Sequence, residues 1–428
     1  MKDQSKNANP APKTEFDDVA VPLSARKSTF SLLMISFGYV FVATTMEIGG
    51  NIFGAMHFGE AMLVTVIGCA ILAALAITMG IISQKTGLNF CLLSRYSFGE
   101  AGNWVMVFIV AFTSMGWFAV DAGLVGQTVH ALFPTVPPMA AALVCVVICT
   151  LVALKGIKAL SILADIAVPV VIVFGVISIV LSLKSTGGLS GLAANSTSDG
   201  SFTFNAAVVA CVGIYAQAAV MFTPDIMRFA KSKKSAVWIM LLSLMIANPF
   251  VLLIGGFGAA ATGEYDIAFI LAAQGLLAPS FIALMLNMLS TMNGCVYTGT
   301  LAVTSSVPKF ARWKLVLAFG VITFILTGFD IFNHFITFIS TLTNTIPPLA
   351  GVFLYDFIFT YRDRYPALER SSFPKANIAS FIAWLCSIAV SYCVPWGLSI
   401  VNAVVTAFVV KLLFDKVFKL NNAVKAAD

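Results

Sequence analysis

The stretch from Ser28 to Gly50 reads STFSLLMISFGYVFVATTMEIGG and combines an apolar run with signs of an interruption. A run of about 20 apolar residues is long enough to cross about 30 Å of hydrocarbon as an α-helix. The second half of this run is punctuated by small and polar residues, namely Thr44, Thr45, Glu47, Gly49 and Gly50. We therefore predict a transmembrane helix that is broken at Gly49 and Gly50, with Glu47 beside the break.

Comparable apolar runs recur along the 428 residues, of which 59% are hydrophobic and only 10% charged, with a mean hydropathy of +0.96. So little charge could not keep a soluble protein of this size dispersed. The runs do not alternate apolar and polar residues as a membrane β-barrel does, so helices must span the bilayer. The sequence predicts an all-α integral membrane protein with about twelve transmembrane helices, near residues 28–50, 60–83, 102–132, 139–154, 159–183, 205–223, 236–258, 280–302, 313–329, 332–356, 376–394 and 396–413.

The distribution of basic residues predicts the orientation in the membrane. If the N-terminus is cytoplasmic, all but one of the 25 Lys and Arg residues fall in cytoplasmic segments or at cytoplasmic helix ends, and the exception is Lys184. Such a bias is typical of multi-pass proteins in the inner (cytoplasmic) membrane, with both termini cytoplasmic. The net charge of +6 therefore needs no nucleic-acid partner to explain it. Residues 1–27 lack the apolar core of a signal peptide and read as a cytoplasmic tail.

The order of the predicted spans suggests a core and an addition. Residues 28–356 hold ten spans, residues 357–375 form a cytoplasmic loop, residues 376–414 hold two further helices, and residues 415–428 form a second tail. The sixth span carries Gly213, Gln217 and Thr223-Pro224, so it is interrupted like the first, and the two open possible five-helix halves. Interrupted helices at matching positions of two halves indicate a substrate site near the bilayer midplane. In the tenth span, Pro347-Pro348 must kink or break the helix, as a hinge or as a static bend.

A stripe of polar side chains in the eighth span is a candidate cation site. Asn287, Ser290 and Thr291 are spaced i, i+3 and i+4, which places them on one helix face. Amide and hydroxyl oxygens suit a hard cation such as Na⁺. Hydrogen bonding between packed membrane helices accounts for the same spacing equally well.

Trp117 and Asp121 in the third span are four residues apart and form a second candidate site. An aromatic face beside a carboxylate can stack a flat ring and accept a hydrogen bond from it. Asp121 lies well inside the span, where a charge costs at least about 2.5 kcal/mol. Its function would be to contact a substrate amine, to couple transport to protons or to bind a cation. A structural pair with another polar group is the alternative, and Trp117 could simply pack.

Other polar groups within the spans are weaker candidates. Glu47 would face an aqueous vestibule at the first-span break. Tyr215 and Gln217 would bracket a break in the sixth span and offer an aromatic face and an amide, although ordinary packing is as good an explanation. Asp165 in the fifth span would pair with a gate arginine or line a water-filled cavity.

Nothing in the sequence indicates an enzyme or a cofactor. The eight Cys residues show no CxxC spacing and the three His residues are scattered, so no metal motif is present. The spans contain no Ser/His/Asp, HExxH or paired-carboxylate arrangement. A transporter without a cofactor, coupled to Na⁺ or H⁺, fits better than an enzyme or a facilitative channel.

Several motifs resemble those of bacterial cytosine permeases, in the nucleobase–cation symport family. The resemblance runs from about residue 21 to the tail, and its most specific segments are Arg95-Tyr96-Ser97-Phe98-Gly99 and Ile346-Pro347-Pro348. Further similar segments are Val21-Pro22, Ser24-Ala25-Arg26-Lys27, Lys85-Thr86-Gly87-Leu88, Gly116-Trp117-Phe118, Ala167-Val168-Pro169, Thr223 with Asp225, and Arg228-Phe229. The resemblance implies a LeuT-like fold, a five-plus-five inverted repeat with two extra C-terminal helices. We expect a monomer.

The resemblance also implies roles for individual residues. Trp117 and Tyr215 would stack on the two faces of a nucleobase, and Asn287 would contact its polar edge. A sodium site would use backbone carbonyls at the first-span break, at Gly38 and Phe41, and the hydroxyls of Ser290 and Thr291.

The chain departs from the cytosine permeases at positions that bear on the substrate. They have Phe where Tyr215 stands, serines at the places of Ile214 and Gln217, and a small residue where Asp121 stands. Relatives of the hydantoin type have glutamine at the Asp121 position. An added carboxylate and amide suit a ligand rich in N–H donors. We expect import of a nucleobase-like heterocycle by cation symport, with cytosine and Na⁺ as first choices. The alternative is a proton-coupled permease for a purine, hydroxymethylpyrimidine, hydantoin or creatinine-type ring.

Overall fold

The computed structural model describes residue 16 and residues 19–154, 158–196, 198–306, 311–420 and 423–426, with the backbone alone for residues 158–168, 283, 305, 425 and 426. Asp165 therefore lies outside the described side chains. Almost every described segment is helical. The α-helices are α1 (Thr29–Val40), α2 (Ala43–Ala55), α3 (Phe58–Thr86), α4 (Phe90–Leu132), α5 (Pro138–Ala153), α6 (Lys158–Thr186), α7 (Leu189–Asn195), α8 (Phe204–Gln217), α9 (Thr223–Met227), α10 (Lys233–Leu242), α11 (Asn248–Thr262), α12 (Ile267–Ala273), α13 (Leu277–Ser306), α14 (Arg312–Gly328), α15 (Phe335–Thr345), α16 (Pro347–Tyr355), α17 (Ile378–Cys393) and α18 (Ser399–Lys416).

Shorter elements join these helices. Three wide π-helical turns, η2 (Ala218–Phe222), η3 (Ser243–Ala247) and η4 (Asp356–Thr360), continue α8, α10 and α16 without a gap. Two 3₁₀ turns are η1 (Leu23–Ala25) and η5 (Leu368–Arg370). The strands β1 (Ser371–Ser372) and β2 (Lys425–Ala426) pair antiparallel.

The helices confirm an all-α membrane protein, but not the number twelve. Within the described ranges, seven helical stretches are long and apolar enough to span a bilayer, and the bent pair α1 and α2 makes eight. The apolar helices α5 and α17 are shorter than a full span. By helix length and composition, the described residues therefore hold seven or eight spans, fewer than the twelve that the apolar runs of the sequence suggest.

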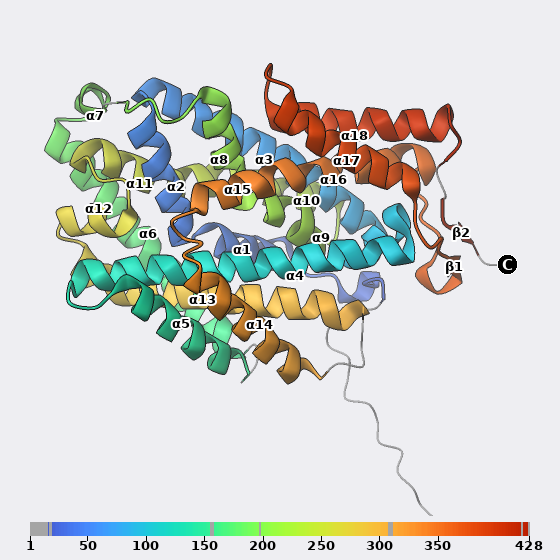
Figure 1. Cartoon of the computed structure of the whole chain (residues 1–428), viewed down its shortest axis with the longest axis horizontal. Coiled ribbons are helices and arrows are strands. Elements are labelled where there is room, and N and C mark those ends of the chain that lie inside the picture. The colour runs from blue at the N-terminus through green and yellow to red at the C-terminus, as the bar shows by residue number, and fades with distance from the viewer. Residues whose placement is uncertain are drawn as a thin grey trace, which may run out of the picture.

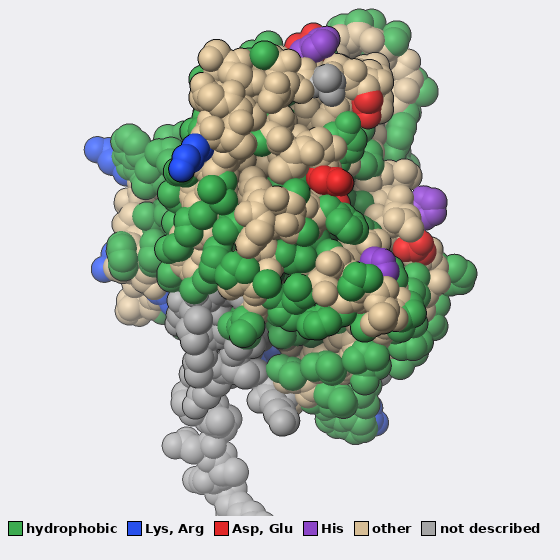
Figure 2. Space-filling view, turned by 90° about the vertical axis from the view of Figure 1, so that its left-hand side faces the viewer, with side chains coloured by type: hydrophobic (Ala, Val, Ile, Leu, Met, Phe, Trp, Pro, Cys, Tyr) green, Lys and Arg blue, Asp and Glu red, His purple; other side chains and the backbone are tan. Residues whose placement is uncertain are grey.

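The bundle has two distinct ends (Figure 1). We call the end that carries β1, β2 and the start of α4 the terminal side, and the end that carries α7 and α12 the capped side. Viewed from the capped side, acidic and His side chains lie on the face toward the viewer, whereas most of the visible basic side chains lie at its rim (Figure 2). This asymmetry agrees with the charge bias of the sequence.

The first span is broken, but not at Gly49 and Gly50. It bends by 54° between α1 and α2, at Phe41 and Val42. Gly49 and Gly50 lie inside α2, where they allow close packing: a Cβ on Gly49 would lie 1.9 Å from the carbonyl oxygen of Leu252 on α11. A Cβ on Gly255 of α11 would in turn lie 1.8 Å from the carbonyl oxygen of Met46. These glycines are therefore packing residues of the kind that membrane helices use at close contacts, and the predicted break there is wrong.

The sixth span is continuous, so the predicted break at Tyr215 and Gln217 is also wrong. Helix α8 passes through both residues and runs on through η2 into α9 as one span from Phe204 to Met227. Pro224 follows the π-helical turn, within α9, and its missing N–H removes one helical hydrogen bond there. Directly after Gln217, the span contains the π-helical turn η2 and no unwound segment.

The tenth span is interrupted as predicted, at the single residue Ile346 between α15 and α16. Pro347 and Pro348 begin α16, the position at which proline is best tolerated in a helix.

Helix α4 contains the predicted third span, residues 102–132, and has an interruption just before it that the sequence pattern did not predict. Gly99, inside α4, has φ +81°, and a Cβ there would lie 2.5 Å from the carbonyl oxygen of Pro374. The backbone groups freed at this point bond to the segment before α17. The amides of Glu100 and Ala101 donate to the carbonyls of Pro374 (2.9 Å) and Lys375 (2.8 Å), and the amide of Asn377 donates to that of Phe98 (3.0 Å).

A buried ion pair lies next to this junction. Lys411 on α18 is fully buried, and its Nζ lies 2.5 Å from Oδ2 of Asp356 on η4. The same Nζ donates to the hydroxyl of Ser380 on α17 (2.8 Å), which donates to the carbonyl of Ser97 on α4 (2.5 Å). The last two helices are thus joined to the third and tenth spans by buried polar contacts.

Candidate functional site

The break of the first span forms the polar centre of the bundle. Helix α1 ends at Val40 and α2 begins at Ala43, so the chain at Phe41 and Val42 leaves the helical hydrogen-bond pattern. Residues 40–50 are all buried. Buried backbone groups that lack helical partners need other ones, and two helices distant in sequence supply them here.

Tyr215 and Asn287 hold the break from two sides. The hydroxyl of Tyr215 on α8 donates to the carbonyl of Val40 (2.7 Å) and shares a hydrogen bond with the hydroxyl of Thr45 (2.8 Å). The amide of Asn287 on α13 donates to the carbonyl of Phe41 (2.7 Å) and accepts from the amide of Ala43 (3.2 Å). Tyr215 and Asn287 thus lie together, as predicted, and in this conformation both form hydrogen bonds with the backbone of the first-span break.

The predicted cation ligands lie around the same break. Ser290 and Thr291 follow Asn287 by one turn of α13, and the hydroxyl of Thr291 donates to the carbonyl of Asn287 (3.1 Å). Gly38 lies in the last turns of α1, with open space where a side chain would stand. In the described residues, no group of three or more His, Cys, Asp or Glu side chains could hold a metal ion. A cation here would depend on carbonyl and hydroxyl oxygens, which suit a hard ion.

Asp121 lies deep in the bundle with no hydrogen-bond partner. Its side chain is 1% exposed, and neither carboxylate oxygen has a partner among the described residues. The hydroxyl of Thr44, in the first turn of α2, is one of the polar groups that face it. A buried carboxylate in this condition is costly, so it needs a proton, a cation or a ligand.

Gln217 presents another unused acceptor. It is 1% exposed, and its Nε2 donates to the hydroxyl of Ser114 on α4 (3.3 Å), while its Oε1 has no partner among the described residues. Ser114 lies seven residues before Asp121 and therefore on the same face of α4. The sequence analysis missed Ser114, although this two-turn spacing from Asp121 was a signal that could have found it.

Trp117 lies between Ser114 and Asp121 on α4 and is half-buried. Its indole makes edge contacts with two phenylalanines of α15, Phe335 and Phe338, at centroid distances of 6.1 and 5.5 Å. It therefore faces the interior of the bundle, toward the tenth span.

Glu47 is placed differently from the expectation of an aqueous vestibule. It is 6% exposed, its Oε2 accepts from the amide of Ile267 (2.8 Å), and its Oε1 accepts from the side chain of Asn51 (3.2 Å). Asp266 accepts from the amide of Ala268 in the same first turn of α12, and burial raises the pKa of Asp266. Glu47 thus ties α2 to the start of α12 on the capped side.

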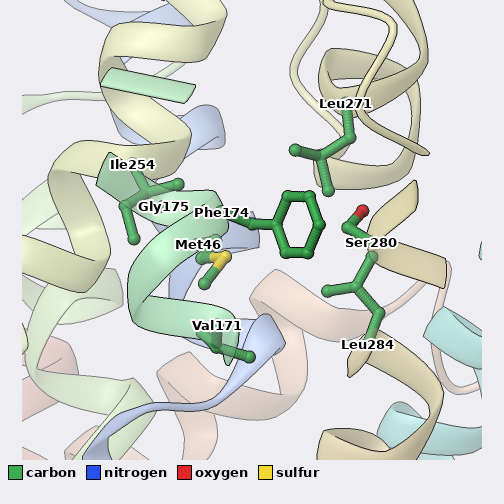
Figure 3. A pocket seen from close by; sticks show the side chains of 8 residues that line it. All are labelled: Met46, Val171, Phe174, Gly175, Ile254, Leu271, Ser280 and Leu284. Atoms are coloured by element: carbon green, nitrogen blue, oxygen red, sulfur yellow. The ribbon is translucent and has the colours of Figure 1, made fainter. Parts of the chain in front are cut away.

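A separate hollow, between α2, α6, α11, α12 and α13, is apolar (Figure 3). Its lining includes Phe174, Leu271 and Leu284, and the one hydroxyl among its eight lining residues, that of Ser280, donates to the carbonyl of Leu276 (2.7 Å). Its lining therefore offers little to bind the polar edge of a heterocycle.

Known proteins share the sequence pattern over nearly the whole chain. The profile of the family described as "Permease for cytosine/purines, uracil, thiamine, allantoin" matches residues 20–416. The cytosine permease of Escherichia coli strain K12 is 29% identical over 416 residues, which are 96% of this chain and 96% of the permease.

Solved transporters share the fold. Mhp1 in its inward-facing conformation matches with a TM-score of 0.81 at 19% identity, over 99% of this chain and 97% of Mhp1. Mhp1, a nucleobase–cation-symport-1 family transporter, in a closed conformation with bromovinylhydantoin bound gives 0.77 at 18% identity, over 92% and 93%. A Na⁺-coupled sialic acid symporter gives 0.66 at 12% identity, over 97% and 94%. The predicted LeuT-like fold class is thereby confirmed.

Proposed function

Because the chain belongs to the family of permeases for cytosine, purines, uracil, thiamine and allantoin, it is a multi-pass membrane transporter, and we propose that it imports a nucleobase-like heterocycle by cation symport. The observation that carries the proposal is the buried first-span break, held by Tyr215 and Asn287 close to the unpartnered carboxylate of Asp121. Broken helices of this kind supply backbone groups for substrates and ions at the bilayer midplane.

The substrate would be a flat ring that stacks on Trp117, with cytosine as the first choice. Stacking of a base on an aromatic side chain contributes about 1–3 kcal/mol. Tyr215 is the candidate for the opposite face. Asp121 and Gln217 would accept hydrogen bonds from the ring. Asn287, whose amide binds the break in this conformation, would contact the polar edge only after exchanging one of those bonds. Glu47 would contribute to the substrate site from the capped side, through its hydrogen bond to the start of α12.

The coupling ion would be Na⁺, bound by the carbonyls of Gly38 and Phe41 and the hydroxyls of Ser290 and Thr291. Support comes from the contact between Asn287 and Phe41, which places this stripe of α13 against the end of α1. No other cofactor is proposed. Ion binding would favour the state that accepts substrate, and alternating access would carry both across. A proton-coupled permease is the second candidate, favoured by the unpartnered carboxylate of Asp121.

The setting would be the inner membrane, with the protein as a monomer and its terminal side in the cytoplasm. The support is the charge bias, since Lys184 is the exception to an otherwise cytoplasmic set of Lys and Arg residues.

The test combines uptake with binding. Proteoliposomes with a Na⁺ gradient should accumulate radiolabelled cytosine or a related heterocycle, and Trp117→Ala should reduce uptake by at least tenfold because the stacking surface is lost. Asn287→Ala should also abolish uptake, since the break loses two hydrogen bonds. Trp313→Ala, on an exposed side chain of α14, is the matched control. Wild-type uptake by Trp117→Ala would refute the site, and uptake that ignores Na⁺ but follows a proton gradient would favour the second candidate.

A further inference from the structure

Three buried oxygen atoms near the first-span break accept no hydrogen bond. They are Oδ1 and Oδ2 of Asp121 and Oε1 of Gln217, each without a partner among the described residues. Both side chains are 1% exposed, so bulk water does not satisfy them. Buried acceptors left unpaired are costly, and a ligand that pairs them is favoured over one that does not.

Among the described residues, no positive charge faces Asp121. The titratable groups that face it are the hydroxyl of Tyr215 on α8 and the thiols of Cys149 on α5 and Cys295 on α13, which are neutral when protonated. Helix α2 adds the hydroxyl of Thr44. Helices α12 and α15 contain no titratable residue, and α14 has Arg312 and Lys314 only in its first turn. The titratable residues of α17 are all exposed, namely Cys386, Tyr392 and Cys393.

The acceptors lie at the two ends of an aromatic surface. Ser114, Trp117 and Asp121 follow one another along one face of α4, and seven residues of helix rise about 10 Å. Gln217 is anchored at the Ser114 end. A flat heterocycle lying on the indole would therefore meet an amide oxygen at one end and a carboxylate at the other.

From this arrangement, and resting on the proposed function, we infer that Asp121 selects heterocycles in which a ring nitrogen stands next to an exocyclic amino group, and binds them together with one proton. The amino group donates to one carboxylate oxygen. The proton lies between the other oxygen and the ring nitrogen, either as O–H···N or as O⁻···H–N⁺. No other bond forms or breaks, and the proton comes from solvent, so each bound substrate carries one H⁺ in addition to the Na⁺ proposed above. The carboxylate is then neutralised and both of its oxygens are paired.

The test uses amino and oxo twins, which differ at the group that the carboxylate would recognise. Purified full-length protein is titrated with cytosine and uracil, and with adenine and hypoxanthine, over a range of alkaline pH. We expect the wild type to bind the amino member of at least one pair at least tenfold more tightly. Its affinity should fall about tenfold per pH unit, as one proton taken up with the ligand requires.

Variants separate the carboxylate from the rest of the pocket. Asp121→Asn should lose both the amino preference and the pH slope, whereas Asp121→Glu should keep the slope with weaker binding. Glu60→Gln, an exposed carboxylate in the first turn of α3, should change neither. Thermal unfolding checks that each variant is folded.

The possible outcomes distinguish this inference from the proposed function. If the wild type binds both twins equally and without a pH slope, or if Asp121→Asn keeps the preference and the slope, the inference is overturned while the transporter of flat heterocycles stands. If the wild type binds none of the four rings and no related heterocycle, the proposed function itself fails.

Discussion

Two of the interruptions in this protein, those of α1–α2 and of α4, are held together in opposite ways. The break between α1 and α2 is held by side chains, because Tyr215 and Asn287 bond to its carbonyls and amides. The interruption of α4 at Gly99 is held by backbone, because the segment before α17 bonds to Phe98, Glu100 and Ala101. Side chains can change rotamer and release a backbone group, whereas a backbone pairing must be lost as a unit. The backbone at the first break can therefore rearrange more easily, whereas the backbone pairing at Gly99 is suited to stay in place.

The buried carboxylates beside the two breaks differ in the same sense. Asp356, near the second break, is paired with Lys411 and also accepts from the hydroxyl of Thr360 (2.9 Å). Asp121, near the first break, has no partner in the described structure. A paired buried charge contributes to one fixed arrangement, and an unpaired one is available to a ligand. The contrast indicates a fixed region around Asp356 and a ligand-binding region around Asp121.

The largest effect is expected from Lys411→Met. This change leaves Asp356 buried without its counter-charge, and breaking a buried pair costs about 3–5 kcal/mol. The purified variant should show a large drop in thermal unfolding temperature and lower amounts in the membrane. Replacing both partners, as Lys411→Met with Asp356→Leu, should restore much of the loss. Lys416→Met, an exposed lysine on the same helix, is the control. A wild-type unfolding temperature for Lys411→Met would show that the pair does not hold the second break.

The next effect is expected from Gly99→Ala. At φ +81° a side chain is strained by about 1–3 kcal/mol, and the added Cβ also meets the carbonyl of Pro374. The thermal unfolding temperature should therefore fall by a moderate amount. Hydrogen exchange should become faster in peptides that cover residues 98–101. Gly59→Ala, where a Cβ has open space, should be nearly neutral. Equal stability of the two variants would mean that the interruption is not fixed by its glycine.

The sequence predicted the helical membrane fold and most helix positions, because apolar runs report directly on burial in lipid. It located the breaks unevenly: Pro347-Pro348 marked the tenth-span interruption and the family resemblance put the first break near Phe41, whereas the pattern of small residues misled. Gly49 and Gly50 were read as an interruption although they serve helix packing, since glycine signals both. Gly99 was quoted as part of a family motif, but its role depends on a segment that follows some 275 residues later and has no local signature. The resemblance already implied that Tyr215 and Asn287 share one site, but their hydrogen bonds to the backbone of the first break required the tertiary structure.

The smallest effect, and the most discriminating one, is expected from Tyr215→Phe. The variant keeps the ring for stacking and loses the hydroxyl that bonds to Val40 and Thr45, a change of about 0.5–1.5 kcal/mol for a typical hydrogen bond. Hydrogen exchange should rise in peptides covering residues 40–46 and stay unchanged at residues 98–101. Substrate affinity should fall only a few-fold, and Tyr392→Phe, on an exposed ring of α17, should alter neither. If exchange at residues 40–46 does not change, the hydroxyl does not hold the first break, and the distinction between side-chain and backbone clamps would rest on Asn287 alone.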